Sequence, residues 1–504
     1  MTHATHVEPW RWSRLSALIG TAGSVLVAYA APRALSDHVV SWWYVPAIPA
    51  GREISLVLVY AGMALLCAAW LALGRALPGP RQLLVIAGLW ALPLALAPPL
   101  FSRDLYSYLA QGTILHLGHN PYDSAPVLLS RLGRGHVLNA VSPFWRHTTA
   151  PYGPLFLSLI SLVVGVAGSN LVAGVLLTRL VELVGLALLA VSVPRLARAL
   201  GADPRRALWL ALLSPLVMLQ LIAAGHNDVL MVGMLAAGVA CALSGRPLMG
   251  VAVCALAATV KVPALAGVVF IAVAWARAEP GRFGPARLLL SAALITVVVL
   301  GTVTLVAGVG VSWISTSLFS TPAKVHLAIT PATGIGYTLS SLLRDIGIDT
   351  SARTVENAVG LVAFAATAVA GLLLVYRVRI RTVVPSLAVF LLIAAAGGPA
   401  AWPWYFIWGL ALITAVPGPQ RSPGLAVALA LSAFLVKPNG ILELPLQSAP
   451  AVVVVYVVIA GVAWRRWRRR GGGRDDDAPE RDGGLTGPGQ RPVRESAPSA
   501  LAGT

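Results

Sequence analysis

Residues 54–74 read Ile-Ser-Leu-Val-Leu-Val-Tyr-Ala-Gly-Met-Ala-Leu-Leu-Cys-Ala-Ala-Trp-Leu-Ala-Leu-Gly, an uncharged stretch bounded by Glu53 and Arg75. A helix needs about 20 mostly apolar residues to cross a bilayer, and this stretch is long enough. Comparable apolar stretches recur at 15–34, 82–99, 171–193, 207–224, 229–244, 247–260, 262–276, 287–309, 354–376, 383–397, 404–416, 424–437 and 450–464. The pattern predicts an all-α, polytopic integral membrane protein with about 13–14 transmembrane helices.

The composition excludes a soluble globular protein. Of the 504 residues, 57% are hydrophobic and 11% are charged, whereas soluble proteins carry about 25% charged residues. The net charge of +18 comes from basic residues in short clusters between apolar runs, which indicates membrane loops rather than a nucleic-acid-binding surface. The three cysteines, Cys67, Cys241 and Cys254, lie in apolar runs, so no disulfide framework or zinc site is expected.

The arginine-rich loops set the expected orientation, because basic residues collect on the cytosolic side of a membrane. Arginine-rich and arginine-poor loops alternate along the chain if residues 154–168 form a helix that lies at the outer surface. If residues 154–168 crossed the membrane instead, the four arginines of residues 194–206 would lie outside. We therefore expect a multi-pass plasma-membrane protein with both termini cytosolic and with external loops at about 100–170 and 310–353. With this orientation we expect seven of the nine histidines to face outward: His38, His116, His119, His136, His147, His226 and His326. We therefore expect the functional site on that extracytoplasmic face.

The composition changes at residue 471. Residues 471–504 are rich in Gly, Pro, Asp and Arg and contain no long apolar run. Such a segment buries too little apolar surface to offset its ordering entropy. We expect residues 1–470 to form one transmembrane domain and residues 471–504 to be a disordered cytosolic tail.

The first candidate site follows the third apolar run, where Arg103 and Asp104 precede a helical pattern. Asp104, Tyr108 and Gln111 lie on one face of that helix. A carboxylate at the water–lipid boundary of an acid-poor chain favours a functional base. An interfacial anchor built from an ion pair and tyrosines is the alternative.

The second candidate site is the proline- and glycine-rich stretch 142–154. It contains Trp145, Arg146, His147 and Tyr152. Aromatic faces pack on the C–H surface of a sugar, and forked donors bind hydroxyl or phosphate oxygens. An ordered loop without a ligand is the alternative.

The third and fourth candidates are polar residues at the ends of apolar runs. His226, Asn227 and Asp228 follow Gly225 in a tight turn, which indicates either an aqueous cavity or an exposed, capped turn. Lys261 interrupts another apolar run and needs an anionic partner, such as Asp228 or a ligand phosphate, unless it extends to the interface. Two weaker candidates are an Arg179–Glu182 pair and an aromatic wall at 399–405.

Several of these motifs together resemble the actinobacterial polyprenol-phosphate-mannose-dependent α-(1→6)-mannosyltransferases over roughly residues 50–440. The matching motifs are Asp104-Leu-Tyr-Ser-Tyr-Leu-Ala-Gln-Gly, Asn120-Pro-Tyr, Ser142-Pro-Phe-Trp, Ala150-Pro-Tyr-Gly-Pro, Gly225-His-Asn-Asp and Lys261-Val-Pro. The resemblance implies an integral membrane glycosyltransferase of the GT-C fold. It also implies that mannose passes from a polyprenyl-phosphate donor to a mannosylated glycolipid, building the mannan core of lipomannan and lipoarabinomannan.

The resemblance places the catalytic carboxylate at Asp104, with Asp228 as the main rival. The donor is β-linked and the product α-linked, so a single inverting displacement with one general base is implied. We expect Arg103 to keep Asp104 ionised. We expect the donor phosphate to meet Lys261, Arg146 or His147, helped by His226 and Asn227, with Asp228, Tyr108, Gln111 and Tyr152 also at the substrate. No cofactor or metal is expected; dependence on a divalent ion is left open.

Two other functional classes remain open at the level of sequence. A transferase with another linkage or sugar, α-(1→2)-mannosyl or pentosyl, would carry similar motifs. A lipid or sugar transporter would also be polytopic, but transporters usually contain repeats with broken helices at mid-membrane. Here the polar residues collect at one face, which favours the enzyme.

The predicted orientation is testable by single-cysteine labelling in intact cells. A cysteine at position 135 should react with a membrane-impermeant reagent, and a cysteine at position 200 should not, because the arginine pattern places them on opposite sides. Labelling at 200 but not at 135 would overturn the topology.

Overall fold

The computed structural model describes residues 9–34, 40–42, 51–316, 330–348, 351–398, 402–438, 440, 449–451, 453, 454 and 457. The chain divides into two units, Met1–Val453 and Val454–Thr504, and nearly all described residues belong to the first. The expected tail at 471–504, its boundary at 470, His38 and His326 lie outside the described residues. So does most of the expected span at 450–464.

Every regular element in the described residues is a helix, which confirms the all-α fold. In the first half of the chain the elements are α1 (Pro9–Ala34), α2 (Arg52–Ala76), α3 (Pro80–Leu96), α4 (Asp104–His116), α5 (Leu128–Arg131), α6 (Gly135–Ala140), η1 (Pro143–Trp145), α7 (Pro154–Ala167), α8 (Leu171–Ala199), α9 (Pro204–Leu212), η2 (Leu216–Ala223) and α10 (Asp228–Leu243). The second half contains α11 (Pro247–Ala258), η3 (Val262–Ala264), α12 (Leu265–Ala276), α13 (Gly284–Ala307), α14 (Ser312–Ser315), α15 (Pro331–Asp345), α16 (Ala352–Arg377), η6 (Ile380–Thr382), α17 (Val383–Gly397), η7 (Pro403–Phe406), α18 (Ile407–Ile413), α19 (Pro417–Gln420), α20 (Pro423–Leu431) and η8 (Ser432–Phe434). Of the η elements, η2 is a π-helix and the others are 3₁₀ turns.

Six described helices are long and apolar enough to cross a membrane, which confirms a polytopic membrane protein. They are Trp12–Ala34, Glu53–Ala76, Leu171–Ala199, Gly284–Ala307, Arg353–Arg377 and Ile380–Gly397. The pair α9 and η2, bent by 49°, makes a seventh if counted as one span. Shorter apolar helices occupy most of the other expected spans, so the total of 13–14 stays a prediction. The expected surface helix is present as α7, Pro154–Ala167, and its depth in the bilayer also stays a prediction.

Proline determines where many of these helices begin. Pro80, Pro154, Pro204, Pro247 and Pro423 each occupy the first turn of a helix. Proline has no N–H to lose there, and its fixed φ already suits the helix. Of these helix starts, the one at Pro154 lies beside the candidate residue Tyr152.

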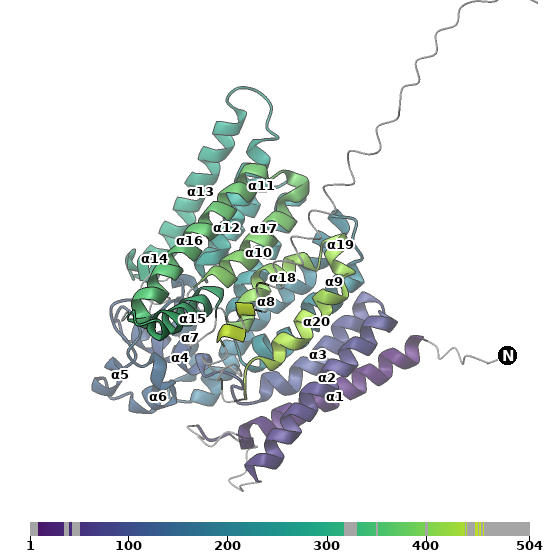
Figure 1. Cartoon of the computed structure of the whole chain (residues 1–504), viewed down its shortest axis with the longest axis vertical. Coiled ribbons are helices and arrows are strands. Elements are labelled where there is room, and N and C mark those ends of the chain that lie inside the picture. Colours follow the sequence, from purple (N-terminus) through teal and green to yellow (C-terminus); the bar gives the residue numbers. More distant parts are fainter. Residues whose placement is uncertain are drawn as a thin grey trace, which may run out of the picture. The chain divides into compact units, whose positions relative to one another are not determined.

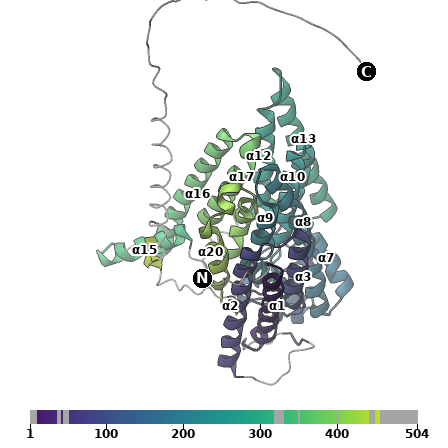
Figure 2. The same cartoon turned by 90° about the vertical axis from the view of Figure 1, so that its right-hand side faces the viewer.

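The central helix of the first unit is α8, which packs against α4, α7, α9 and α10 (Figure 1). Its approach to α10 is close, because a Cβ on Gly233 would meet the backbone carbonyl of Gly185. Small residues allow such backbone contact between apolar helices. On one flank α1, α2 and α3 pack together, and on the other α11, α12 and α13 pack beside α16 and α17 (Figure 2).

Two tryptophans join the N-terminal helices to α9. The indole N–H of Trp70 in α2 donates to the Trp209 carbonyl at 3.1 Å, and that of Trp209 donates to the Trp70 carbonyl at 2.8 Å. Their rings stack with centroids 4.7 Å apart. Both donors are thus satisfied in an apolar interior, where an unpaired N–H would be costly.

Replacing Gly233 with alanine should destabilise the protein. The added methyl group meets the α8 backbone, and overpacking of this kind costs about 1–3 kcal/mol. The melting temperature of detergent-solubilised Gly233→Ala should fall clearly below wild type. The matched control is Gly301→Ala in α13, where a Cβ meets nothing within 4 Å. Equal melting temperatures for the two variants would contradict close packing of α8 and α10.

Candidate active site

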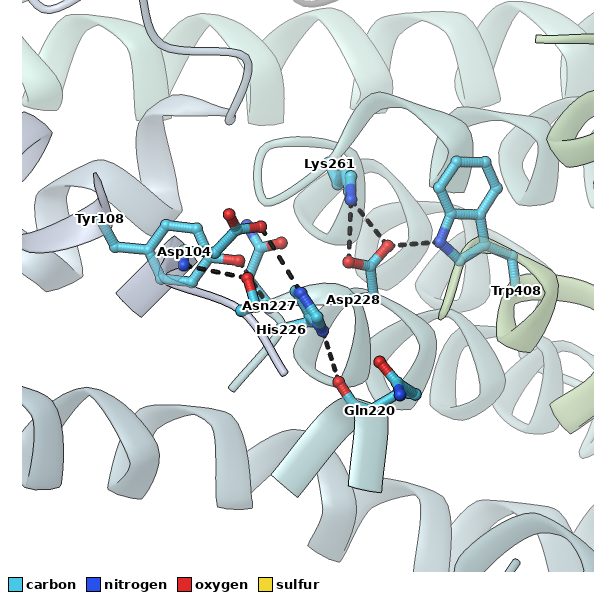
Figure 3. A network of polar contacts seen from close by, with 9 residues as sticks. Asp104, Tyr108, Gln220, His226, Asn227, Asp228, Lys261 and Trp408 are labelled. Atoms are coloured by element: carbon cyan, nitrogen blue, oxygen red, sulfur yellow. Dashed lines mark hydrogen bonds and ion pairs between the residues drawn. The ribbon is translucent and has the colours of Figure 1, made fainter. Parts of the chain in front are cut away.

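One polar network gathers residues from four separate segments of the chain (Figure 3). Asp104 begins α4, and His226, Asn227 and Asp228 form the turn from η2 into α10. Lys261 precedes η3, and Trp408 lies in α18. The network therefore lies where several helices end or begin, and no single segment builds it.

A strained loop positions Asp104. Phe101 has φ +62°, a left-handed conformation that L side chains rarely adopt. The Phe101 N–H donates to the Pro438 carbonyl at 3.1 Å, and the Leu100 N–H donates to the Ala223 carbonyl at 3.1 Å. Strained residues of this kind persist where the surrounding structure holds them, often at functional sites. Asp104 then starts α4, where the helix dipole favours a carboxylate.

His226 is held on three sides within the turn. Gly225 has φ +71°, and the Leu105 side chain occupies the space that a Cβ would need, so only glycine suits this position. The His226 Nδ1 makes a hydrogen bond with the Gln220 carbonyl in the π-helix η2. Its ring stacks on Trp404 with centroids 3.8 Å apart, and its Nε2 lies 3.6 Å from Asp104 Oδ2.

Asp228 and Lys261 form a buried ion pair. The Lys261 ammonium donates to both Asp228 oxygens, at 2.7 and 2.9 Å, and the Trp408 indole N–H donates to Oδ1 at 2.6 Å. The Lys261 ammonium also lies 4.4 Å from the Tyr405 ring centroid. The Asp228 side chain is 1% exposed and that of Lys261 12% exposed, so a path from outside reaches the lysine end of the pair.

The loop that precedes α7 docks beside Lys261 through its backbone. The Gly153 N–H donates to the Val260 carbonyl at 2.9 Å, and a Cβ on Gly153 would meet the Thr259 backbone. This docking places Tyr152, whose ring meets the Tyr108 ring edge-on at 4.8 Å. The Tyr108 hydroxyl in turn accepts the Asn227 N–H at 3.4 Å. Two tyrosines therefore line the space between α4 and the turn.

Arg179 in α8 fastens the segments that lead into the site. Its guanidinium donates to the Ala95 carbonyl at 2.8 Å and to the Ala223 carbonyl at 2.8 Å, and it also bonds the carbonyls of Ala97 and Pro98. These carbonyls lie at the ends of α3 and η2, where no further N–H group of the same helix can donate to them. One buried cation thus anchors both the loop before Asp104 and the turn before His226.

Buried polar atoms without a hydrogen-bond partner collect around this network. Within the described ranges they include Nε2 of His226, both side-chain amide atoms of Asn227 and of Gln220, Oε1 of Gln111 and Oγ of Ser107. Buried polar groups nearly always find a partner, so each such atom needs an explanation. A bound polar ligand or water in this space would supply the missing partners.

Burial dominates the electrostatics of the two facing groups. It raises the pKa of the Asp104 carboxyl, while His226 and then Lys261 act to lower it. Burial also lowers the pKa of His226, which Asp104 and then Asp228 oppose. The expectation that Arg103 keeps Asp104 ionised stays a prediction, and His226 and Lys261 are the neighbours that act to lower the pKa of Asp104 here.

The structure brings together seven of the residues expected at the site: Asp104, Tyr108, Tyr152, His226, Asn227, Asp228 and Lys261. Gln111 is buried further along α4, and Arg103 lies directly before that helix. An exposed turn at 226–228 is wrong, because His226 and Asn227 are fully buried.

Arg146 and His147 are not part of this network. The Arg146 guanidinium donates to the carbonyls of Val141 and Asn139 on its own loop, at 3.2 Å each. His147 is exposed. Grouping them with Lys261 relied on motif chemistry alone, and the fold of the loop directs Arg146 to its own backbone.

Sequence reasoning missed Trp408 and Gln220. The aromatic stretch at 399–405 gave a partial signal, because Trp404 and Tyr405 do line the site. Its first residues, Pro399–Ala401, lie outside the described residues. Trp408 follows Tyr405 by three positions, which places both on one helical face, and their rings stack at 4.7 Å. Gln220 contributes a main-chain carbonyl, for which side-chain motifs give no signal.

A metal site was not expected and remains untested. Among the residues that the structure describes, no three His, Cys, Asp or Glu side chains are grouped so that they could hold a metal ion.

Comparison with known proteins gives a consistent match along the chain. The family model "Alpha-(1->6)-mannopyranosyltransferase, N-terminal domain" matches residues 15–277, and the "MptB C-terminal domain" model matches residues 330–467. Alpha-(1->6)-mannopyranosyltransferase A of Mycobacterium tuberculosis is 37% identical over 406 residues, 77% of each chain. A probable alpha-(1->6)-mannopyranosyltransferase of Mycolicibacterium smegmatis is 31% identical over 89% of this chain and 85% of its own. Alpha-(1->6)-mannopyranosyltransferase B of Corynebacterium glutamicum is 30% identical over 81% and 74%. No solved structure matches the chain.

Arg179→Met should lower the melting temperature of the detergent-solubilised protein strongly. Each buried carbonyl left without a donor costs about 1–3 kcal/mol. Arg179→Lys should fall between Arg179→Met and wild type, because one ammonium cannot match the planar fork of the guanidinium. Arg198→Met, at an exposed position of the same helix, is the matched control. A melting temperature of Arg179→Met as high as that of this control would contradict the anchoring role.

Proposed function

The chain belongs to the α-(1→6)-mannopyranosyltransferase family, and we propose that it transfers mannose from polyprenyl-phosphate mannose to the growing α-(1→6)-mannan core of lipomannan and lipoarabinomannan. It is accordingly a membrane-embedded glycosyltransferase. The observation that carries the finer proposal is the buried network in which one carboxylate, Asp104, faces a histidine while a second, Asp228, is already paired with Lys261.

Asp104 is the general base in this proposal, and the hydrogen bonds favour it over Asp228. Lys261 and Trp408 donate three hydrogen bonds to the Asp228 carboxylate, so its oxygens are already engaged. The imidazole Nε2 of His226 lies 3.6 Å from Asp104 Oδ2, farther than the donors that bond Asp228. Burial raises the pKa of Asp104, and a raised pKa makes a carboxylate a better proton acceptor.

The proposed reaction is a single displacement at the anomeric carbon. The acceptor hydroxyl oxygen forms the new bond to that carbon as the bond to the donor phosphate oxygen breaks. The hydroxyl proton passes to Asp104, and the bonding electron pair leaves with the polyprenyl phosphate. One displacement needs one base and inverts the configuration, from a β-linked donor to an α-linked product.

Lys261 is the cation that we propose for the departing phosphate. The Lys261 side chain is 12% exposed and that of Asp228 is 1% exposed, so we expect a phosphate to approach the pair from the lysine side. A fixed cation in a poorly hydrated site stabilises developing negative charge more than water does. Lys261 belongs to the network, whereas Arg146 and His147 do not, so we favour Lys261 for this role.

Aromatic and amide groups supply the means to orient a sugar. Tyr108, Tyr152 and Trp404 offer apolar ring faces and edges at the network. The Asn227 amide is fully buried, and neither of its polar side-chain atoms has a partner among the described residues. Rings pack on the C–H face of a sugar, and an amide satisfies itself on hydroxyl groups.

The proposal includes the setting of the reaction. We place the site on the extracytoplasmic face of the plasma membrane, with both termini cytosolic, because the arginine-rich loops mark the opposite side. A lipid-linked donor then arrives from the bilayer and a mannosylated glycolipid acceptor from the outer leaflet. The transporter alternative loses support, since the relatives are named as transferases.

Asp104→Asn should abolish most transfer. The change keeps the shape of the side chain but removes the base, so the rate should fall about 10²–10⁴-fold. The assay uses purified protein with labelled polyprenyl-phosphomannose and an oligomannoside acceptor, followed by linkage analysis of the product.

The control for this prediction is Asp123→Asn, an exposed carboxylate in the same external segment, which should retain near wild-type transfer. Asp228→Asn should separate the two carboxylates further. A dead Asp228→Asn together with an active Asp104→Asn would move the base to Asp228.

Lys261 is best tested together with its partner. Lys261→Met alone leaves Asp228 buried without a cation, which costs about 3–5 kcal/mol and confuses folding with function. The double variant Lys261→Met/Asp228→Asn removes both charges and should fold. Its KM for the donor should rise about 10–100-fold, the worth of a charged hydrogen bond of about 1.5–3 kcal/mol. Normal turnover by the folded double variant at low donor concentration would limit Lys261 to a structural role.

A further inference from the structure

The two groups that face each other at the centre of the network come from distant segments. Asp104 begins α4, and His226 lies in the turn between η2 and α10. The His226 side chain is completely buried and that of Asp104 is 16% exposed, so substrate can reach the carboxylate but not the imidazole. The 3.6 Å between Nε2 and Oδ2 is slightly longer than a hydrogen bond, a gap that catalytic pairs often close only with substrate present.

The hydrogen bond on the far side of the ring fixes the tautomer of neutral His226. A backbone carbonyl only accepts, so the Nδ1 that bonds the Gln220 carbonyl must carry a proton. In neutral His226 the Nε2 therefore carries a lone pair, and this lone pair faces the Asp104 carboxylate. Among the described residues Nε2 has no other hydrogen-bond partner. Two acceptors facing each other in a buried site repel, and one proton between them removes the repulsion.

We propose that His226 is the proton partner of Asp104: the two side chains form one dyad that binds a single proton, and this dyad accepts the proton of the acceptor hydroxyl. The inference rests on the proposed role of Asp104 as base. His226 does not touch the substrate and acts through Asp104, so it is a positioning residue that also shares the proton.

Of the ionisable groups that surround His226, the Asp104–His226 dyad is the one that binds a proton most easily. On the α10 side Asp228 is paired with Lys261, and on the α8 side Arg179 bonds carbonyl groups with Glu182 one turn further along. Tyr108 of α4 and Tyr405 of η7 are the neighbouring phenols, and burial raises the pKa of Tyr108 well above its usual value. Trp404 of η7 covers the ring face.

Burial moves the proton affinities of the two partners toward each other. It raises the pKa of Asp104 and lowers the pKa of His226. Groups that interact this closely titrate as a pair. In the transfer step the proton from the acceptor hydroxyl lands on the dyad as the new glycosidic bond forms, and it leaves to solvent past the exposed edge of Asp104.

The test is the pH dependence of kcat/KM, whose acid limb reports protonation of the base in the free enzyme. His226→Gln places an amide near the Nε2 position; this amide donates a hydrogen bond to Asp104 but binds no proton. The carboxylate should then protonate at lower pH, and the acid limb should move down by about one pH unit or more. An acid limb in the wild-type position would overturn the proposal.

Trp404→Leu is the matched control for packing. It removes the ring that stacks on His226 while leaving both members of the dyad, so the rate should fall with the acid limb in place. An equal shift in both variants would assign the effect to lost packing and overturn the proposal. If Asp104 were not the base at all, Asp104→Asn would transfer mannose at a near wild-type rate. That outcome is distinguishable from a failure of the dyad proposal alone.

A second measurement does not depend on the folding of His226→Gln. Wild type and Asp104→Asn, labelled with ¹⁵N-histidine, are titrated by NMR. One imidazole should titrate at lower pH in Asp104→Asn, because the imidazolium loses its anionic partner. Identical titration of every histidine in the two proteins would show that no histidine is coupled to Asp104 and would overturn the proposal.

Discussion

The ion pair between Lys261 and Asp228 ties the start of α10 to the junction of α11 and η3, inside a bundle of apolar helices. Neither charge is stable alone at this depth, because breaking a buried pair by removing one partner costs about 3–5 kcal/mol. Trp408 adds a third segment to the same carboxylate. The pair and Trp408 therefore set the relative positions of three chain segments, and Asp104 faces His226 beside them.

The ends of helices supply most of the remaining support. The last carbonyls of α3 and η2 have no partners within their own helices, and Arg179 and the Leu100 N–H bond to them. The π-helical form of η2 directs the Gln220 carbonyl to His226. π-helical turns are often found at functional sites for this reason. The network in Figure 3 is thus built as much from main-chain groups as from charged side chains.

The site draws on both regions of the family match. Asp104, His226, Asp228 and Lys261 lie within residues 15–277, whereas Trp404 and Trp408 lie within residues 330–467. The second region contributes a ring that covers His226 and a donor that bonds Asp228. Trp404 thus helps to shield the buried imidazole from water, and electrostatic interactions strengthen when water is excluded.

The sequence by itself determined the membrane character and the helical class, and it singled out most of the residues that the structure brings together in the network. Apolar run length and charge spacing are local properties, so residues 54–74 and the arginine clusters could be interpreted without a fold. Asp104, His226, Asp228 and Lys261 were singled out because such side chains are unusual in apolar surroundings, and the motif resemblance includes the same positions.

Only the tertiary structure decided which of these residues meet. The Asp228–Lys261 pair was one of two options for the lysine, and the contact of Asp104 with His226 spans more than a hundred residues. Arg146 bonds the backbone of its own loop and does not join Lys261. Trp408 and the Gln220 carbonyl gave no motif, because a hydrogen bond across helices depends on packing and backbone direction. Those are set by how α8, α10 and α18 fit together, and no local pattern encodes that fit.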